Sequence, residues 1–119
     1  MAVRAAKYEI LNGIQLKVTW EGLEENGGTR DSGAPVSVNR PVEGLIAQAV
    51  GNFDTSVTVQ MQGSNDGSNW FSIGAGTLAA ATPSRTIDER PLFIRPLIAA
   101  DGAADASDVD VIMVGAIYR

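Results

Sequence analysis

The chain has 119 residues and a mass of 12.5 kDa, which suits one domain and is short for two. It contains no cysteine and no histidine, so it offers no disulfide, no thiolate metal site and no imidazole base. Its net charge of −5 and lack of a Lys/Arg cluster argue against direct binding to nucleic acid. No apolar run approaches the roughly 20 residues of a membrane helix, and polar residues interrupt the N-terminus early. We therefore expect no signal peptide, no membrane partner and synthesis in the cytoplasm.

The first part of the chain predicts an arm, a strand and a loop. Residues 1–13 hold too few apolar side chains to define a strand face, so we expect a short N-terminal arm before a domain of residues 14–119. Residues 14–20 alternate apolar and polar side chains, which is typical of a half-buried strand. Residues 21–35 are polar and Gly-rich and predict a long surface loop.

Further strands are predicted between short clusters of turn residues. Gly44 and Gly51 lie too close together for an ordinary helix, so the apolar segment between them favours a strand. Pro96 places its strand at a sheet edge or a bulge, and the small, acidic residues 99–107 predict a loop. The expected strands after the first are residues 42–50, 57–61, 69–73, 77–81, 92–98 and 109–117. Six to eight short antiparallel strands indicate an all-β, single-domain β-sandwich of jelly-roll type.

Residues 63–70, with the sequence GSNDGSNW, are the sharpest local feature. Asp66-Gly67 follows an alternating strand and predicts a tight hairpin turn, because glycine tolerates positive φ. Asn65 and Asn69 can close local hydrogen bonds to the backbone, and Trp70 begins the return strand. A calcium loop is the alternative, but the spacing and the terminal Glu of an EF-hand loop are missing. We interpret these five residues as a structural turn and predict no metal site.

The remaining polar groups do not form a recognisable catalytic pattern. Four aspartates between residues 101 and 110 fit a solvated loop better than a cation site. The acidic pairs at 24–25 and 88–89 offer carboxylates whose separation the sequence does not fix. No nucleophile elbow and no nucleotide-binding glycine pattern occurs. We expect no catalytic residue, no cofactor and no small-molecule substrate.

Two kinds of side chain leave alternatives open. Arg95 lies between Ile94 and Pro96 in an apolar segment, where an arginine either reaches solvent or pairs with a carboxylate, as in a salt bridge between subunits. Trp20 and Trp70 are more typical of core or turn packing than of a ligand platform.

Three segments together carry a resemblance to a known family. They are VTWEGL at 18–23 with a Gly-rich loop ending at Ala34-Pro35, SVTVQMQ at 56–62 running into GSNDGSNW, and FIRP at 93–96 followed by a Gly/Asp loop and DVDVIM at 108–113. In order and spacing they resemble small virion proteins of tailed bacteriophages, of the head decoration (cement) type. The resemblance covers roughly residues 14–117.

The resemblance implies a homotrimeric β domain on the outer surface of a phage capsid. Such a protein would stabilise the shell by bridging subunits of the major capsid protein, after synthesis in the cytoplasm of the bacterial host. The alternative is a discoidin-like carbohydrate-binding module on a phage tail, spike or fibre, because those jelly rolls carry a similar S-N-D-G-x-x-W hairpin. The candidate contacts with the capsid or with other copies are Val3, Tyr8, Ile10 and Leu11, which are inferred only from the composition of the arm, together with Trp20 and Arg95.

Overall fold

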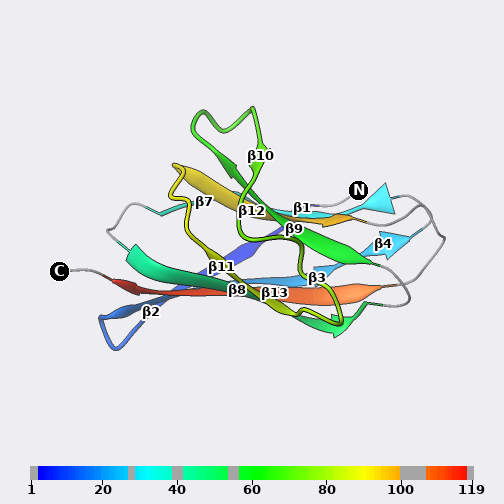
Figure 1. Ribbon diagram of the computed structural model, residues 1–119, viewed down its shortest axis with the longest axis horizontal. Coiled ribbons are helices and arrows are strands. Elements are labelled where there is room, and N and C mark those ends of the chain that lie inside the picture. Colours follow the sequence, from blue (N-terminus) through cyan, green and yellow to red (C-terminus); the bar gives the residue numbers. More distant parts are fainter. Residues whose placement is uncertain (1–2, 27–28, 39–41, 54–56, 100–106, 118–119) are drawn as a thin grey trace.

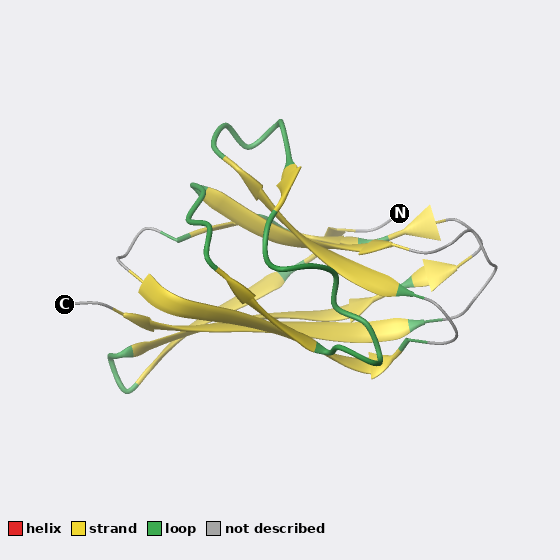
Figure 2. Cartoon of the chain, viewed as in Figure 1, coloured by secondary structure: helices red, strands yellow, loops and turns green. Residues whose placement is uncertain are grey.

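The backbone runs mainly in strands, which turns and loops connect (Figures 1 and 2). A computed structural model describes residues 3–26, 29–38, 42–53, 57–99 and 107–117, and this part of the chain holds no helix that could cross a membrane. Sheet A contains β1 (Val3–Arg4), β6 (Ser32–Gly33), β7 (Val36–Ser37), β9 (Thr58–Ser64), β10 (Phe71–Ser72) and β12 (Phe93–Ala99). Sheet B contains β2 (Ala6–Leu11), β3 (Gln15–Leu23), β8 (Val42–Asn52), β11 (Ser84–Ile87) and β13 (Asp108–Ile117). A separate hairpin consists of β4 (Glu25–Asn26) and β5 (Thr29–Arg30).

The strand order is that of a jelly roll. Sheet B runs β11-β8-β13-β3-β2, and in sheet A β12 lies between β6 and β7 on one side and β9 on the other, with β10 beyond. The antiparallel pairs are therefore nested along the chain: β3 with β13, β6 and β7 with β12, β8 with β11, and β9 with β10. Nested pairs of this kind, alternating between two sheets, define the double Greek key of a jelly roll. The expected all-β sandwich is confirmed.

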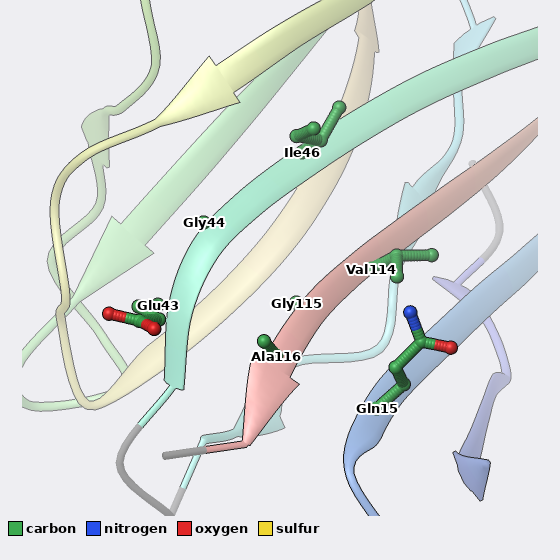
Figure 3. Close-up of a pocket in the computed structure, with 7 residues that line it drawn as sticks. All are labelled: Gln15, Glu43, Gly44, Ile46, Val114, Gly115 and Ala116. Atoms are coloured by element: carbon green, nitrogen blue, oxygen red, sulfur yellow. The ribbon is translucent and has the colours of Figure 1, made fainter. Parts of the chain in front are cut away.

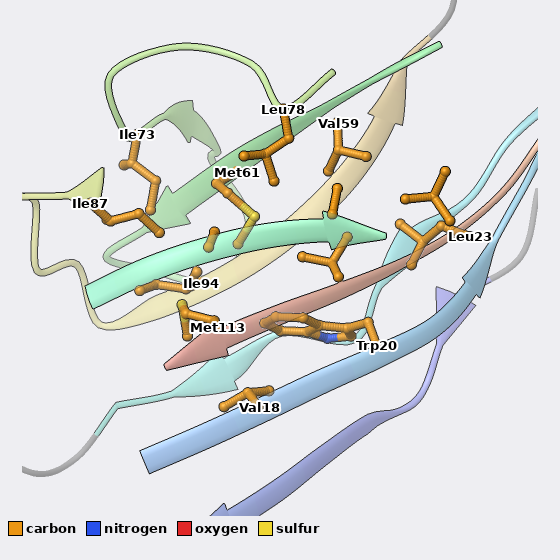
Figure 4. Close-up of a cluster of buried hydrophobic side chains, with 14 of the residues drawn as sticks. Val18, Trp20, Leu23, Val59, Met61, Ile73, Leu78, Ile87, Ile94 and Met113 are labelled. Atoms are coloured by element: carbon orange, nitrogen blue, oxygen red, sulfur yellow. The ribbon is translucent and has the colours of Figure 1, made fainter. Parts of the chain in front are cut away.

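The core lies between the two sheets and follows the alternation of the sequence (Figure 4). In β3, Leu16, Val18 and Trp20 are fully buried, while the residues between them face outward. Period-two alternation places every second side chain on one face of a strand, so one face of each long strand supplies the core. The other core residues from the long strands are Leu23, Leu45, Ala47, Ala49, Val59, Met61, Ile94, Ile98, Val109, Val111 and Met113.

The N-terminal segment is part of the sandwich, which corrects the expectation of an arm. Val3 and Arg4 pair in parallel with β6, and β2 pairs along β3 from Ala6 opposite Trp20 to Leu11 opposite Gln15. The sandwich therefore begins within residues 1–13 and not at residue 14. Residues 1–2 lie outside the described chain.

A tight turn at Asn12 and Gly13 folds β2 back along β3. Both residues have left-handed φ angles, 54° and 69°, and the Ile14 amide donates to the Leu11 carbonyl at 3.1 Å. Positive φ at both central residues is the type I′ geometry, for which Asn-Gly is the preferred sequence. The Asn12-Gly13 dipeptide is the sequence signal for this hairpin, and the expectation of an arm at residues 1–13 missed it.

The segment 21–35 is not one long loop, which corrects a second expectation. β3 continues to Leu23, and β4, β5 and β6 come after it within the segment. Asp31 is 4% exposed, and its Oδ2 accepts hydrogen bonds from Arg4 Nε at 2.9 Å and the Glu24 amide at 3.0 Å. The Arg4–Asp31 ion pair, with Nη2 and Oδ2 2.9 Å apart, thus fastens β1 to this segment. An ion pair therefore stabilises the position of β1, whereas apolar burial stabilises the long strands.

Two further strand predictions need correction. β12 is an interior strand although it contains Pro96: its neighbour on one side changes from β7 at Ile94 to β6 at Leu97, so the missing N–H of the proline falls between two partners. Residues 77–81 form only an isolated bridge from Leu78 to Val59. The strand in this region is β11, whose sequence SRTI shows no alternation. Most of the expected loop at 99–107 lies outside the described residues, including Asp101 and Asp105.

Candidate functional site

The β2–β3 hairpin carries the largest concentration of exposed apolar side chains. Five of the nine large hydrophobic residues exposed in the described chain lie within its first 14 residues. One of them, Val3, belongs to sheet A. We call the other four the N-terminal edge: Tyr8, Ile10, Leu11 and Ile14, which are 40%, 37%, 36% and 55% exposed.

Sheet A covers β3 and leaves the adjoining face of β2 open. Tyr8 lies opposite Val18, and Ile10 lies opposite Leu16, and residues directly opposite in an antiparallel pair share one face of the sheet. Val18 and Leu16 are fully buried, whereas Tyr8 and Ile10 are not. The inward face of β2 is therefore an exposed apolar surface next to the core. Apolar surface that gathers in one place marks an interaction site more often than scattered residues do.

Of the predicted contact residues, the structure brings Tyr8, Ile10 and Leu11 together and separates the others. Trp20 is 0% exposed, so its assignment as a contact is wrong. It shares the face of Leu16 and Val18, and its Nε1 donates to the Ala34 carbonyl at 2.9 Å. The indole is a core side chain whose polar atom is satisfied inside the domain.

Arg95 lies on the outer face of sheet A, where it stacks on Trp70. Its guanidinium carbon is 4.0 Å from the centroid of the Trp70 ring, and its Nε donates to Gln62 Oε1 at 2.9 Å. Partial burial lowers the pKa of Arg95 from its ordinary value. Arginine is effectively always protonated in proteins, so the side chain stays charged. The stack joins β12 to Trp70, which directly precedes β10. Trp70 therefore packs across β9, the strand between β12 and β10.

The 64–70 loop joins β9 to β10 and is organised by the Asp66 carboxylate. Oδ1 accepts from the amides of Ser68 and Asn69, both at 2.8 Å, and from the Ser64 hydroxyl at 2.9 Å. Oδ2 accepts from Asn69 Nδ2 at 2.7 Å. These bonds, the Asn69 amide foremost, hold the pKa of Asp66 well below its usual value. Their contribution is full above the ordinary carboxyl pKa of about 3.9 and is lost as the pH falls towards the folded-state pKa.

The loop is wider than the predicted two-residue turn. β9 ends at Ser64 and β10 begins at Phe71, so Asp66 and Gly67 are the centre of a longer connection. Asn65 Oδ1 accepts from the Leu92 amide at 3.2 Å and ties the loop to the start of β12. Both Asp66 oxygens are occupied by donors of the loop itself, which favours turn chemistry.

Gly67→Val is expected to lower the free energy of unfolding by about 1–3 kcal/mol. Gly67 has a φ of 77°, which a β-branched residue adopts only under strain. A Cβ would meet Phe93 no closer than 3.7 Å, so the loss reflects backbone strain and not a clash. Ser68→Val is the control, with an expected change within about 0.5 kcal/mol. Equal denaturation midpoints for Gly67→Val and the wild type would contradict this account of the loop.

A shallow depression of about 520 Å³ lies on the outer face of sheet B (Figure 3). It forms beside Gly44, which carries no side chain, where the register between β13 and β8 shifts after Val114. Ile46, Val114 and Ala116 supply its apolar lining, and the Gln15 amide and the Glu43 carboxylate supply its polar groups. One carboxylate and one amide provide no base–nucleophile pair.

Acidic side chains elsewhere act as structural hydrogen-bond acceptors. Asp110 Oδ1 accepts from the Gly22 amide at 2.9 Å and joins β13 to β3. Within the described ranges, no three His, Cys, Asp or Glu side chains group as metal ligands.

The comparisons with known proteins return nothing. No family model, no curated protein and no solved structure matches the chain.

Proposed function

We propose that the chain is a structural virion protein that decorates a bacteriophage capsid and stabilises it by bridging major capsid protein subunits. Three features support the proposal: the resemblance of the three sequence segments, a jelly-roll domain, and the N-terminal edge. The N-terminal edge carries the argument, because it gathers four exposed apolar side chains on the β2–β3 hairpin. The partner is a protein; no nucleic acid, membrane, cofactor or small-molecule substrate is part of the proposal.

The β2–β3 turn is the part of the N-terminal edge best placed to meet the capsid. Leu11 and Ile14 flank Asn12-Gly13, and the Ile14 carbonyl accepts from the Ile117 amide at 2.8 Å. That bond fixes the turn to β13, so its apolar side chains are held in place before binding. Preorganisation of this kind reduces the entropy lost on association. Val3, exposed on sheet A, is a further proposed contact.

Several copies acting together would compensate for a small contact in each. We propose a homotrimer that forms on threefold positions of the shell, where each domain presents the same turn to the lattice. Repeating one modest contact in linked copies raises the overall affinity through effective concentration. The chain is acidic, with a net charge of −5, and binding through repeated apolar contacts does not require a basic patch.

Ile14→Lys is expected to weaken binding to undecorated capsids by at least about tenfold, because it places a charge in an apolar contact. The measurement is co-sedimentation of the purified protein with capsids over a range of protein concentrations. Leu92→Lys is the matched control, since Leu92 is 58% exposed and lies at the start of β12. It should bind as the wild type does.

The same binding should change little between low and high salt, because apolar burial is not screened. Saturation of the shell by folded Ile14→Lys protein would refute the turn as the contact. Binding that collapses in moderate salt would show that ion pairs dominate the contact instead.

A carbohydrate-binding module on a tail, spike or fibre is the second candidate. The observation that favours it is the cluster of Trp70, Arg95 and Gln62 on the outer face of sheet A, since aromatic rings with oriented polar groups bind sugars. A glycan array separates the two candidates: the decoration proposal expects no glycan to bind, and the module expects binding that Trp70→Ala abolishes.

A further inference from the structure

β2 is the longest edge strand of the sandwich in the described chain. It has six residues, against four in β11 and two in each of β1, β7 and β10, the other strands with one open side. One side of β2 pairs with β3, and its other side has no strand partner among the residues described. Free edges of this kind are templates for pairing with another chain unless short length, proline, a bulge or charged side chains block them. β2, with the sequence AKYEIL, contains no proline.

The sequence of β2 is complementary to itself when read in the opposite direction. Lys7 and Glu9 lie on either side of Tyr8, and both belong to the outer face of sheet B, opposite Thr19 and Lys17 of β3. If two copies of β2 run antiparallel about Tyr8, Lys7 of each copy lies opposite Glu9 of the other. Opposite charges in direct cross-strand positions stabilise a sheet, and like charges destabilise it.

The neighbouring registers are excluded by the same rule. A two-fold axis perpendicular to the sheet places the outer faces of both copies on the same side. Only registers that pair outer-face residues with outer-face residues are therefore possible. A shift centred on Lys7 would place two lysines opposite each other, and a shift centred on Glu9 would place two glutamates opposite each other. Only the pairing centred on Tyr8 matches charges at both positions.

The inner face of β2 fits this pairing as well. Centred on Tyr8, the two tyrosine side chains meet, and Ala6 of each copy lies opposite Ile10 of the other. Tyr8 and Ile10 are 40% and 37% exposed, and a small residue opposite a large one leaves room for both. On the outer face of the sheet, the charges of neighbouring strands then alternate in sign: Lys17 of β3, Glu9 of β2, and Lys7 in β2 of the second copy.

We propose that two copies of this chain associate through their β2 edges, antiparallel and centred on Tyr8, to form one continuous sheet B across a two-fold axis. This inference does not rest on the proposed function, although the pairing covers Tyr8 and Ile10 of the N-terminal edge and leaves the β2–β3 turn to meet the capsid. The contact differs from the threefold association proposed on the shell, because it is isologous and closes with two chains. It also leaves Ile14 outside the pairing. The free protein is therefore a dimer.

Charge reversal on the full chain tests the dimer by light scattering coupled to size exclusion. The wild type should have twice the 12.5 kDa mass of one chain. Lys7→Glu or Glu9→Lys alone places like charges opposite each other twice per dimer and should weaken association by about tenfold or more. The double variant Lys7→Glu/Glu9→Lys should restore it, as should an equimolar mixture of the two single variants.

Glu43→Lys is the control, because it changes the net charge as Glu9→Lys does and lies in β8, three strands away in sheet B. It should remain dimeric, and circular dichroism checks that each variant is folded. A monomeric wild type, or an oligomer that is indifferent to both single reversals, would overturn the proposal. So would a double variant that stays dissociated while folded.

Discussion

Trp20→Ala is expected to lower the free energy of unfolding by about 3–5 kcal/mol. The indole is 0% exposed between the two sheets (Figure 4), and a Cβ on Gly33 would lie only 2.5 Å from its ring, which shows how closely it is packed. Truncation removes this packing, leaves a cavity, and deprives the Ala34 carbonyl of the donor at 2.9 Å. The measurement is denaturant-induced unfolding followed by circular dichroism.

Trp70→Ala is the matched control for this prediction. Trp70 is partly exposed, and its stacking with Arg95 contributes about 0.5–1 kcal/mol at such a site. We therefore expect a much smaller loss than for Trp20. Equal losses for the two tryptophans would mean that Trp20 is not the centre of the core.

Arg4→Ala is expected to cost about 2 kcal/mol, the second largest effect. The Asp31 side chain is only 6% exposed and pairs with Arg4, so removing the guanidinium leaves a buried carboxylate without its countercharge. Such a loss reaches about 3–5 kcal/mol for a fully buried pair. The Arg4 side chain is 34% exposed, and solvent screening reduces the figure.

Arg30→Ala controls for the loss of one positive charge, because Arg30 is exposed, and should change stability by no more than about 0.5 kcal/mol. A double-mutant cycle with Asp31→Asn measures the coupling between Arg4 and Asp31 directly. If Arg4→Ala were as mild as Arg30→Ala, β1 would not be fastened by this pair. The N-terminal segment would then be closer to the arm that the composition suggests.

The long strands could be predicted from the sequence because burial imposes a period of two on them. Residues 14–20 and 57–61 alternate, and β3 and β9 lie there. β11 could not be predicted in this way, because Arg85 between Ser84 and Thr86 leaves no apolar face to recognise. β1 is likewise held by pairing and by the Arg4–Asp31 contact, which are long-range interactions that no local pattern encodes.

The candidate surface is predictable in part. Tyr8, Ile10 and Leu11 are expected as contacts and are exposed, but in a paired strand and not in an arm. The alternation that buries Leu16 and Val18 also places Trp20 on the inner face, so its burial follows from the sequence. The same alternation assigns Ile14 to a strand, and its exposure reflects the Asn12-Gly13 turn beside it.

The copy number of the chain in purified phage particles tests the central claim most directly. Quantitative mass spectrometry against the major capsid protein gives this number without any assumption about the contact surface. Decoration of the shell predicts a simple whole-number ratio to the major capsid protein, because every equivalent lattice position is occupied. Only a few copies per particle, as in a portal, tail tip or spike, would contradict the proposal, and so would absence from the particle.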